Sequence, residues 1–164
     1  MNAKKMQKLL VLWAVPVLFL TQTVLAGMQG IQKPNFSGTW NFNPEKSKLQ
    51  IPAPTSSTFR IDHREPEFHL SRTHVFEGKS DTWGVDLTTD GKEVIQESDG
   101  QTIHICLTWE GNDLIFDSKI VMKDREATNV VRYHLSEDGK IFTATERFRG
   151  PLLKYDNVWV FDKE

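Results

Sequence analysis

Ten short runs of strand-forming residues follow one another from residue 38 to the end of the chain, and no helix-length amphipathic segment interrupts them. The runs are rich in Val, Ile, Thr, Phe and Trp, and Asp-Gly, Glu-Gly or Pro separates them at roughly the ~8 to 12 residue spacing typical of a meander or barrel. An open sheet of this length would leave two exposed edges, and closure removes them. We therefore expect an all-β fold, an antiparallel up-and-down β-barrel of about 8–10 strands. The expected strands are residues 38–43, 57–63, 67–76, 81–88, 92–97, 101–109, 113–122, 127–135, 141–149 and 155–162.

The first 26 residues have the organisation of a secretory signal peptide. Three lysines within residues 4–8 precede an apolar run over residues 9–20, and a polar tail ends at Ala26. Because the apolar run is shorter than the ~20 residues that cross a bilayer, we expect cleavage after Ala26 and no stable membrane span in the mature chain. The expected organisation is a signal peptide at 1–26 and one barrel domain at 27–164, in a secreted or periplasmic protein.

Charge and motif content argue against several classes of function. Three of the 20 Lys and Arg residues and none of the 22 acidic residues lie in the leader, so the mature chain has a formal charge of −5. There is no basic stripe with interleaved aromatics, and nucleic-acid binding is not expected. No Gly-x-Ser-x-Gly, His-Glu-x-x-His or phosphate-binding glycine loop occurs. We therefore expect a binding protein without a cofactor, not an enzyme, and favour a monomer.

Alternation along the strands indicates which side chains face the interior, because successive residues point to opposite faces. A two-residue turn at Asp90-Gly91 would join strands 81–88 and 92–97 and place Trp83 and Leu87 inside. The segment 44–56 contains three prolines and is expected to be a mobile entrance flap. The expected apolar lining of a ligand site is Phe42, Phe59, Ile61, Trp83, Leu87, Ile105, Leu107, Phe116 and Ile120, with Tyr133 or Arg147 fixing the ligand's polar end.

The last hairpin has two possible registers. A two-residue loop at Asp138-Gly139 would place Glu146 on the interior face with Tyr133, whereas a three-residue loop starting at Glu137 would place Arg147 there. A shift of one residue moves every side chain of a strand to the opposite face. The register therefore decides whether an acid or a base meets the ligand.

Residues Gly38-Thr39-Trp40, at the head of the first strand, resemble the Gly-x-Trp opening of the calycins, the superfamily of lipocalins and fatty-acid-binding proteins. The final run, residues 157–163, is similar to the closing strand of a fatty-acid-binding protein. The whole mature chain is most similar to the small lipocalin-like domains of exported bacterial proteins. The resemblance implies that a basic residue late in the chain packs on Trp40 at the closed barrel end, with Arg147 as the candidate and Arg149 as the alternative. It also implies a small hydrophobic ligand, such as a lipid or fatty acid, in the interior.

Two other functions stay open at this point. Side chains could fill the barrel and leave an envelope-associated interaction module. A haem or metal carrier similar to the nitrobindins, which also have ten strands and one axial histidine, would use His104 or His134. The five histidines show no metal-ligand spacing, so no metal site is predicted.

Overall fold

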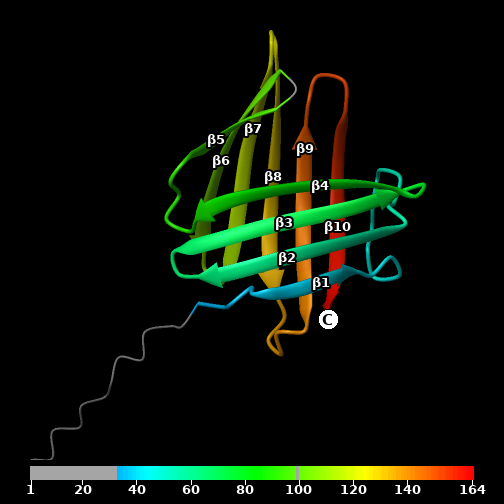
Figure 1. Ribbon diagram of the computed structural model, residues 1–164, viewed down its shortest axis with the longest axis vertical. Helices are drawn as coiled ribbons and strands as arrows, with labels where there is room; N and C mark the ends of the chain where they lie inside the picture. Colours follow the sequence, from blue (N-terminus) through cyan, green and yellow to red (C-terminus); the bar gives the residue numbers. More distant parts are fainter. Residues whose placement is uncertain (1–32, 99) are drawn as a thin grey trace, which may run out of the picture. The chain divides into compact units, whose positions relative to one another are not determined.

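The computed structural model describes residues 33–98 and 100–164, and the expected signal peptide at 1–26 lies outside them. Ten antiparallel strands form a single sheet in the order β4-β3-β2-β1-β10-β9-β8-β7-β6-β5. The pairing of β1 with β10 joins the two ends of the domain and curls the sheet into a nearly closed barrel (Figure 1). The expected all-β barrel is confirmed. Its strands are β1 (Gly38–Phe42), β2 (Ser56–Arg64), β3 (Glu67–Phe76), β4 (Lys79–Thr88), β5 (Val94–Ser98), β6 (Gln101–Glu110), β7 (Asp113–Met122), β8 (Arg125–Leu135), β9 (Ile141–Arg149) and β10 (Lys154–Lys163).

The strands end at the turn residues that were identified in the sequence. Gly111 and Gly139 adopt φ values of 62° and 67°, in the left-handed region that glycine enters without a Cβ clash. Each lies in the tight connection between two strands. This local chemistry explains why the expected and observed strands coincide closely along the chain.

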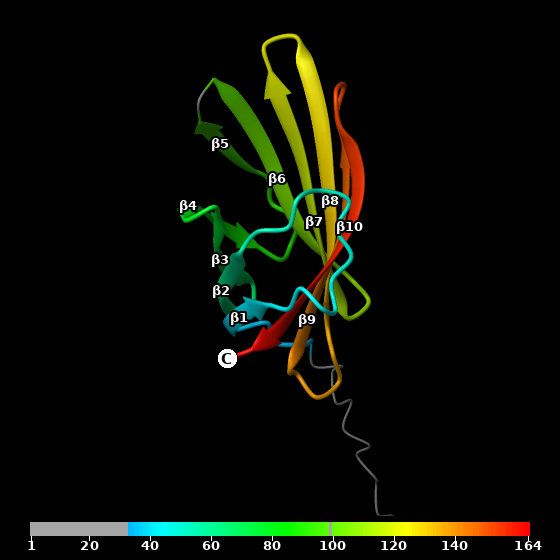
Figure 2. The same ribbon diagram turned by 90° about the vertical axis from the view of Figure 1, so that its right-hand side faces the viewer.

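The hairpin expected at Asp90-Gly91 is wrong. β5 pairs with β6 alone, and β4 pairs with β3 alone, so the two strands next to this turn are the edges of the sheet. The Gly91 N–H donates to the Leu107 carbonyl at 3.0 Å, and Asp90 forms a bridge with Thr108. The turn is fastened to β6 and cannot close a hairpin, so β4 and β5 lie apart, as Figure 2 shows.

The Gln96 side chain connects the two unpaired edges. Its Nε2 donates to the Gly84 carbonyl at 2.9 Å, and its Oε1 accepts from Trp83 Nε1 at 3.1 Å. Because Gln96→Ala removes both of these hydrogen bonds, we expect the free energy of unfolding to fall by about 1 kcal/mol. We also expect faster amide hydrogen exchange in β4, measured by mass spectrometry beside urea denaturation. The exposed neighbour Glu97 supplies the control variant, Glu97→Ala, and equal exchange rates in the two variants would contradict the prediction.

The core fills the end of the barrel where β1 begins. Trp40 is fully buried, and its Nε1–H donates to the Phe36 carbonyl at 2.9 Å. Trp40 and Lys163 are paired across β1 and β10, and Lys163 Nζ lies 5.0 Å from the centre of the indole ring. The basic residue that packs on Trp40 is therefore Lys163, and the assignment of this role to Arg147 or Arg149 is wrong. Arg149 instead donates to Asp156 at 2.7 Å.

The segment expected to be a mobile flap is fastened along β10. Lys48 forms a backbone bridge with Val158, with hydrogen bonds of 2.8 Å in both directions. The Gln50 N–H donates to Asn157 Oδ1 at 2.7 Å, and Leu49 and Ile51 pack against the core. The prolines exclude helices here, as expected, but the backbone between them still forms hydrogen bonds with β10.

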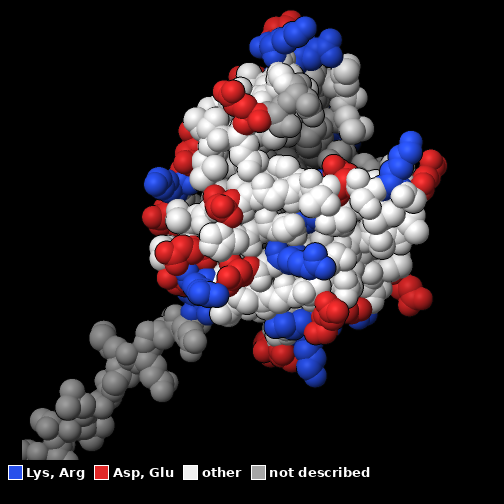
Figure 3. Space-filling view, in the orientation of Figure 1, with Lys and Arg blue, Asp and Glu red and all other residues white. Residues whose placement is uncertain are grey.

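The surface carries charges of both signs. Lys and Arg side chains are interspersed with Asp and Glu on the face shown in Figure 3, without a continuous basic stripe there. In the part of the chain that the structure describes, no helix has the length and apolar composition needed to cross a membrane.

Candidate functional site

A cavity of about 260 Å³ lies inside the barrel, in the half toward the β5–β6 and β7–β8 turns. This volume is just below the ~300–1,000 Å³ of typical small-molecule sites. The side chains therefore leave a space inside the barrel. Six of the residues expected to contact a ligand line it: Phe59, Trp83, Ile105, Phe116, Ile120 and Tyr133.

Four other expected contact residues lie elsewhere in the interior. Ile61, Leu87 and Leu107 are buried in the core and do not line the cavity. Phe42 packs against the Trp159 ring at 5.6 Å and does not line the cavity either. Alternation predicted the correct face for these residues but carried no information on their height along the barrel axis.

Arg147 lies outside the barrel, which corrects its assignment as a ligand and barrel-end residue. Its side chain is 72% exposed, and its Nε lies 3.8 Å from Asp156. β8 and β9 pair Val131 with Glu146, so Glu146 faces inward. The turn is closed by Ser136 and Ile141, leaving four residues between them. An even number of turn residues keeps the side-chain parity of the two-residue loop.

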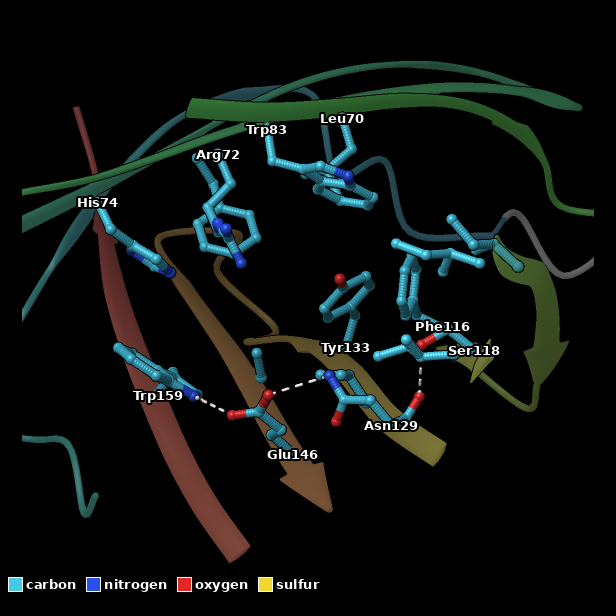
Figure 4. A pocket seen from close by; sticks show the side chains of 16 residues that line it. Leu70, Arg72, His74, Trp83, Phe116, Ser118, Asn129, Tyr133, Glu146 and Trp159 are labelled. Atoms are coloured by element: carbon cyan, nitrogen blue, oxygen red, sulfur yellow. Dashed lines mark hydrogen bonds between the residues drawn. The ribbon is translucent and has the colours of Figure 1, made fainter. Parts of the chain in front are cut away.

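Glu146 is the centre of a hydrogen-bond cluster in the cavity wall. Its Oε1 accepts from Asn129 Nδ2 at 3.0 Å, and its Oε2 accepts from Asn157 Nδ2 at 2.9 Å and from Trp159 Nε1 at 2.8 Å. Figure 4 shows the carboxylate between Asn129 and Trp159. Hydrogen bonds of this kind stabilise a carboxylate away from bulk water.

The charge of Glu146 contributes to the pKa shifts of two tyrosines. Burial raises the pKa of Tyr133 far above its ordinary value, and the charge of Glu146 raises it further. Burial likewise raises the pKa of Tyr155 to about 12, and Glu146 adds to the shift. Both phenols are therefore neutral donors at physiological pH.

Arg72 and His74, both on β3, form the facing wall. The Arg72 guanidinium lies 5.8 Å from the centre of the Trp83 ring, and its Nη2 donates to Asp81 at 3.1 Å. His74 stacks on Trp159 with ring centroids 5.5 Å apart, and its Nδ1 lies 2.8 Å from Ser57 Oγ. Burial, followed by the charge of Arg72, lowers the pKa of His74 to about 4, so the imidazole is neutral at pH 7.

His74 should make stability depend on pH. Its folded pKa of about 4 lies below the ordinary 6.5, so the unfolded state binds more protons between these values. We expect the free energy of unfolding to fall as pH drops from 6.5 toward 4, and the decline to be shallower in His74→Gln. Urea denaturation across this interval measures both slopes. His134→Gln, at an exposed histidine, is the control, and parallel slopes in wild type and His74→Gln would contradict the assignment.

Sequence reasoning missed the polar half of the cavity wall. Arg72 and His74 follow Phe68 and Leu70 at the alternate positions of one strand, so the inward parity was present in the sequence. Their side-chain types argue for the solvent face, because polar and charged residues in a strand are ordinarily exposed. The other lining residues outside the expected set of ligand contacts are Leu70, Ile103, Ser118, Asn129, Val131, Ala144 and Trp159.

The proposed haem ligands do not reach the cavity. His104 lies on the outer face of β6 with Nδ1 3.3 Å from Glu93, and His134 lies on the outer face of β8 with Nδ1 2.7 Å from Asp113. Both positions alternate with inward-facing neighbours, which corrects their assignment as axial ligands. Within residues 33–98 and 100–164, no group of three or more His, Cys, Asp or Glu side chains is placed to hold a metal ion.

Comparison with known proteins identifies the fold. No protein-family model and no curated protein sequence matches the chain. A secretory abundant heat-soluble protein of Ramazzottius varieornatus superposes with a TM-score of 0.58 at 12% identity, over 80% of this chain and 98% of that chain. Human cRBP IV gives 0.53 at 14% identity over 80% and 99%, and the zebrafish ileal bile acid-binding protein complexed with cholic acid gives 0.52 at 16% identity over 79% and 98%. The resemblance drawn from Gly38-Thr39-Trp40 is therefore confirmed for the fold, and this chain folds into the same kind of β-barrel as these proteins.

Proposed function

We propose that this chain is an exported small-molecule-binding protein that holds a small, largely apolar ligand inside its barrel. The observation that carries the proposal is the cavity of about 260 Å³, whose lining includes the aromatic residues Phe59, Trp83, Phe116, Tyr133 and Trp159. Apolar cavities with a few convergent polar groups are the usual form of a small-molecule site. The volume favours a ligand smaller than a long-chain lipid.

The structural neighbours support a binding role. The zebrafish protein with the same fold is named for bile acids and was crystallised with cholic acid. The barrel supplies a scaffold and a cavity, and we assign it no catalytic step. The two histidines expected as haem ligands, His104 and His134, both face outward, so neither supports a haem carrier.

Binding is tested by filling the cavity. Ala144 is 2% exposed and lines it, while Thr145 is the next residue of β9 and faces solvent. We expect an apolar fluorescent probe to bind wild type saturably, to bind Thr145→Leu equally well, and to bind Ala144→Leu at least about tenfold more weakly, since the added side chain occupies the space. Native mass spectrometry of protein from its own host would identify the ligand. Absence of saturable binding in wild type would overturn the proposal.

Export is tested separately. The proposal requires removal of the leader, and cleavage after Ala26 would leave Gly27 as the first residue. Expression of the full chain in its own host, followed by fractionation and N-terminal sequencing, measures this. Full-length protein retained in the cytoplasm would contradict the export part and leave ligand binding unaffected.

A further inference from the structure

Opposite charges face each other across the cavity. Arg72 projects from β3 and Glu146 from β9, and Figure 4 shows the two side chains on different sides of the same space with Tyr133 beside them. Each has its own protein partners. The guanidinium is paired with Asp81, and the carboxylate accepts from Asn129, Asn157 and Trp159. Arg72 and Glu146, both among the described residues, form no ion pair with each other.

Both sides keep hydrogen-bonding capacity. Glu146 Oε1 accepts one hydrogen bond from the protein, and a carboxylate oxygen can accept two. Arg72 Nε is a buried donor without an acceptor, and Asn129 Oδ1 is a buried acceptor without a donor. Unpartnered buried polar atoms are uncommon in folded proteins. Each of the two facing parts of the wall therefore keeps one polar atom without a protein partner.

Among the described residues, no other ionised group lines the cavity. The half-buried imidazole of His74 and the buried phenol of Tyr133 are neutral at pH 7. Asp81, the partner of Arg72, is 68% exposed and does not line the cavity. Within the wall, one guanidinium therefore faces one carboxylate.

We infer that the cavity selects ligands whose polar end has no net charge and both donates and accepts hydrogen bonds, such as a hydroxyl or a primary amide. This inference rests on the proposed binding function and specifies its ligand class. The ligand oxygen accepts from the Arg72 guanidinium, and its O–H or N–H donates toward Glu146. A ligand carboxylate would be attracted by Arg72 and repelled by Glu146. A ligand ammonium would be attracted by Glu146 and repelled by Arg72.

A series of decyl compounds with one chain and different heads tests the selection. Decanol, decanamide, decanoate and decylamine are titrated into wild type at pH 7, and the fluorescence of Trp83 and Trp159, which line the cavity, reports binding. We expect decanol and decanamide to bind at least about tenfold more tightly than either ion, since an ion leaves one buried group unmatched. Tightest binding of decanoate or decylamine would overturn the inference and leave the proposed function standing. Failure of all four to bind saturably would contradict the proposed function and this inference with it.

Two charge-removing variants then identify the residues responsible. Glu146→Gln should raise the affinity for decanoate relative to decanol by about tenfold, and Arg72→Gln should do the same for decylamine, because each removes the like charge that repels that ion. Arg147→Gln, which neutralises a side chain 72% exposed on the outer face, should leave the ranking unchanged. Circular dichroism confirms folding of each variant. An unchanged ranking in both folded interior variants would overturn the inference, and if Glu146→Gln does not fold, the wild-type ranking and Arg72→Gln decide.

Discussion

Replacing Phe142 with alanine is expected to lower the free energy of unfolding by about 3–5 kcal/mol, the range for deletion of a large buried aromatic side chain. Phe142 is fully buried on β9. Its ring lies 5.3–6.0 Å from the rings of five other aromatic residues, which come from strands on both sides of the barrel and from the segment before β1. They are Phe36, Trp40, Phe59, Tyr133 and Phe161. The variant therefore loses packing across the barrel, and small domains have little stability in reserve.

Urea denaturation followed by tryptophan fluorescence measures this loss. Phe76→Ala is the matched control, because Phe76 is 39% exposed at the end of β3. We expect the control to lose less than about 1 kcal/mol, as surface substitutions do. Similar losses in the two variants would show that Phe142 does not link the two sides of the barrel.

Removal of the Glu146 carboxylate is the second large effect. In Glu146→Ala, the side-chain N–H groups of Asn129, Asn157 and Trp159 lose their acceptor. An unsatisfied buried donor costs about 1–3 kcal/mol, and water entering the cavity satisfies part of the set, so we expect a total loss of about 3 kcal/mol. Asn157 also accepts from the Gln50 N–H, so amide exchange at Gln50 should accelerate.

Glu126→Ala is the control for this variant. Glu126 is a 60% exposed carboxylate on the outer face of the neighbouring strand, and it pairs with Lys119 at 2.8 Å. Surface pairs of this kind contribute at most about 1 kcal/mol. Chemical denaturation and amide exchange measured by mass spectrometry compare the two. Unchanged exchange at Gln50 in Glu146→Ala would refute the connection between the cavity wall and the segment along β10.

Much of the fold was predictable, because local signals agreed with one another. Turn glycines and alternating apolar residues located all ten strands, and period-two alternation placed Trp83, Phe116 and Tyr133 on the inner face. The site was predictable only in part. Arg72 had the correct parity, but its charge argued for the solvent face, and its partner Asp81 lies on another strand.

The sequence by itself determined the strands and their inward faces, because these depend on backbone propensities and spacing within a few residues. The tertiary structure alone decided three things. It left β4 and β5 unpaired with each other, and it placed Lys163 on Trp40 through the pairing of the first and last strands. It also turned Glu146 inward and Arg147 outward. Each of these depends on contacts between segments far apart in the chain, where pairing and burial outweigh local preference.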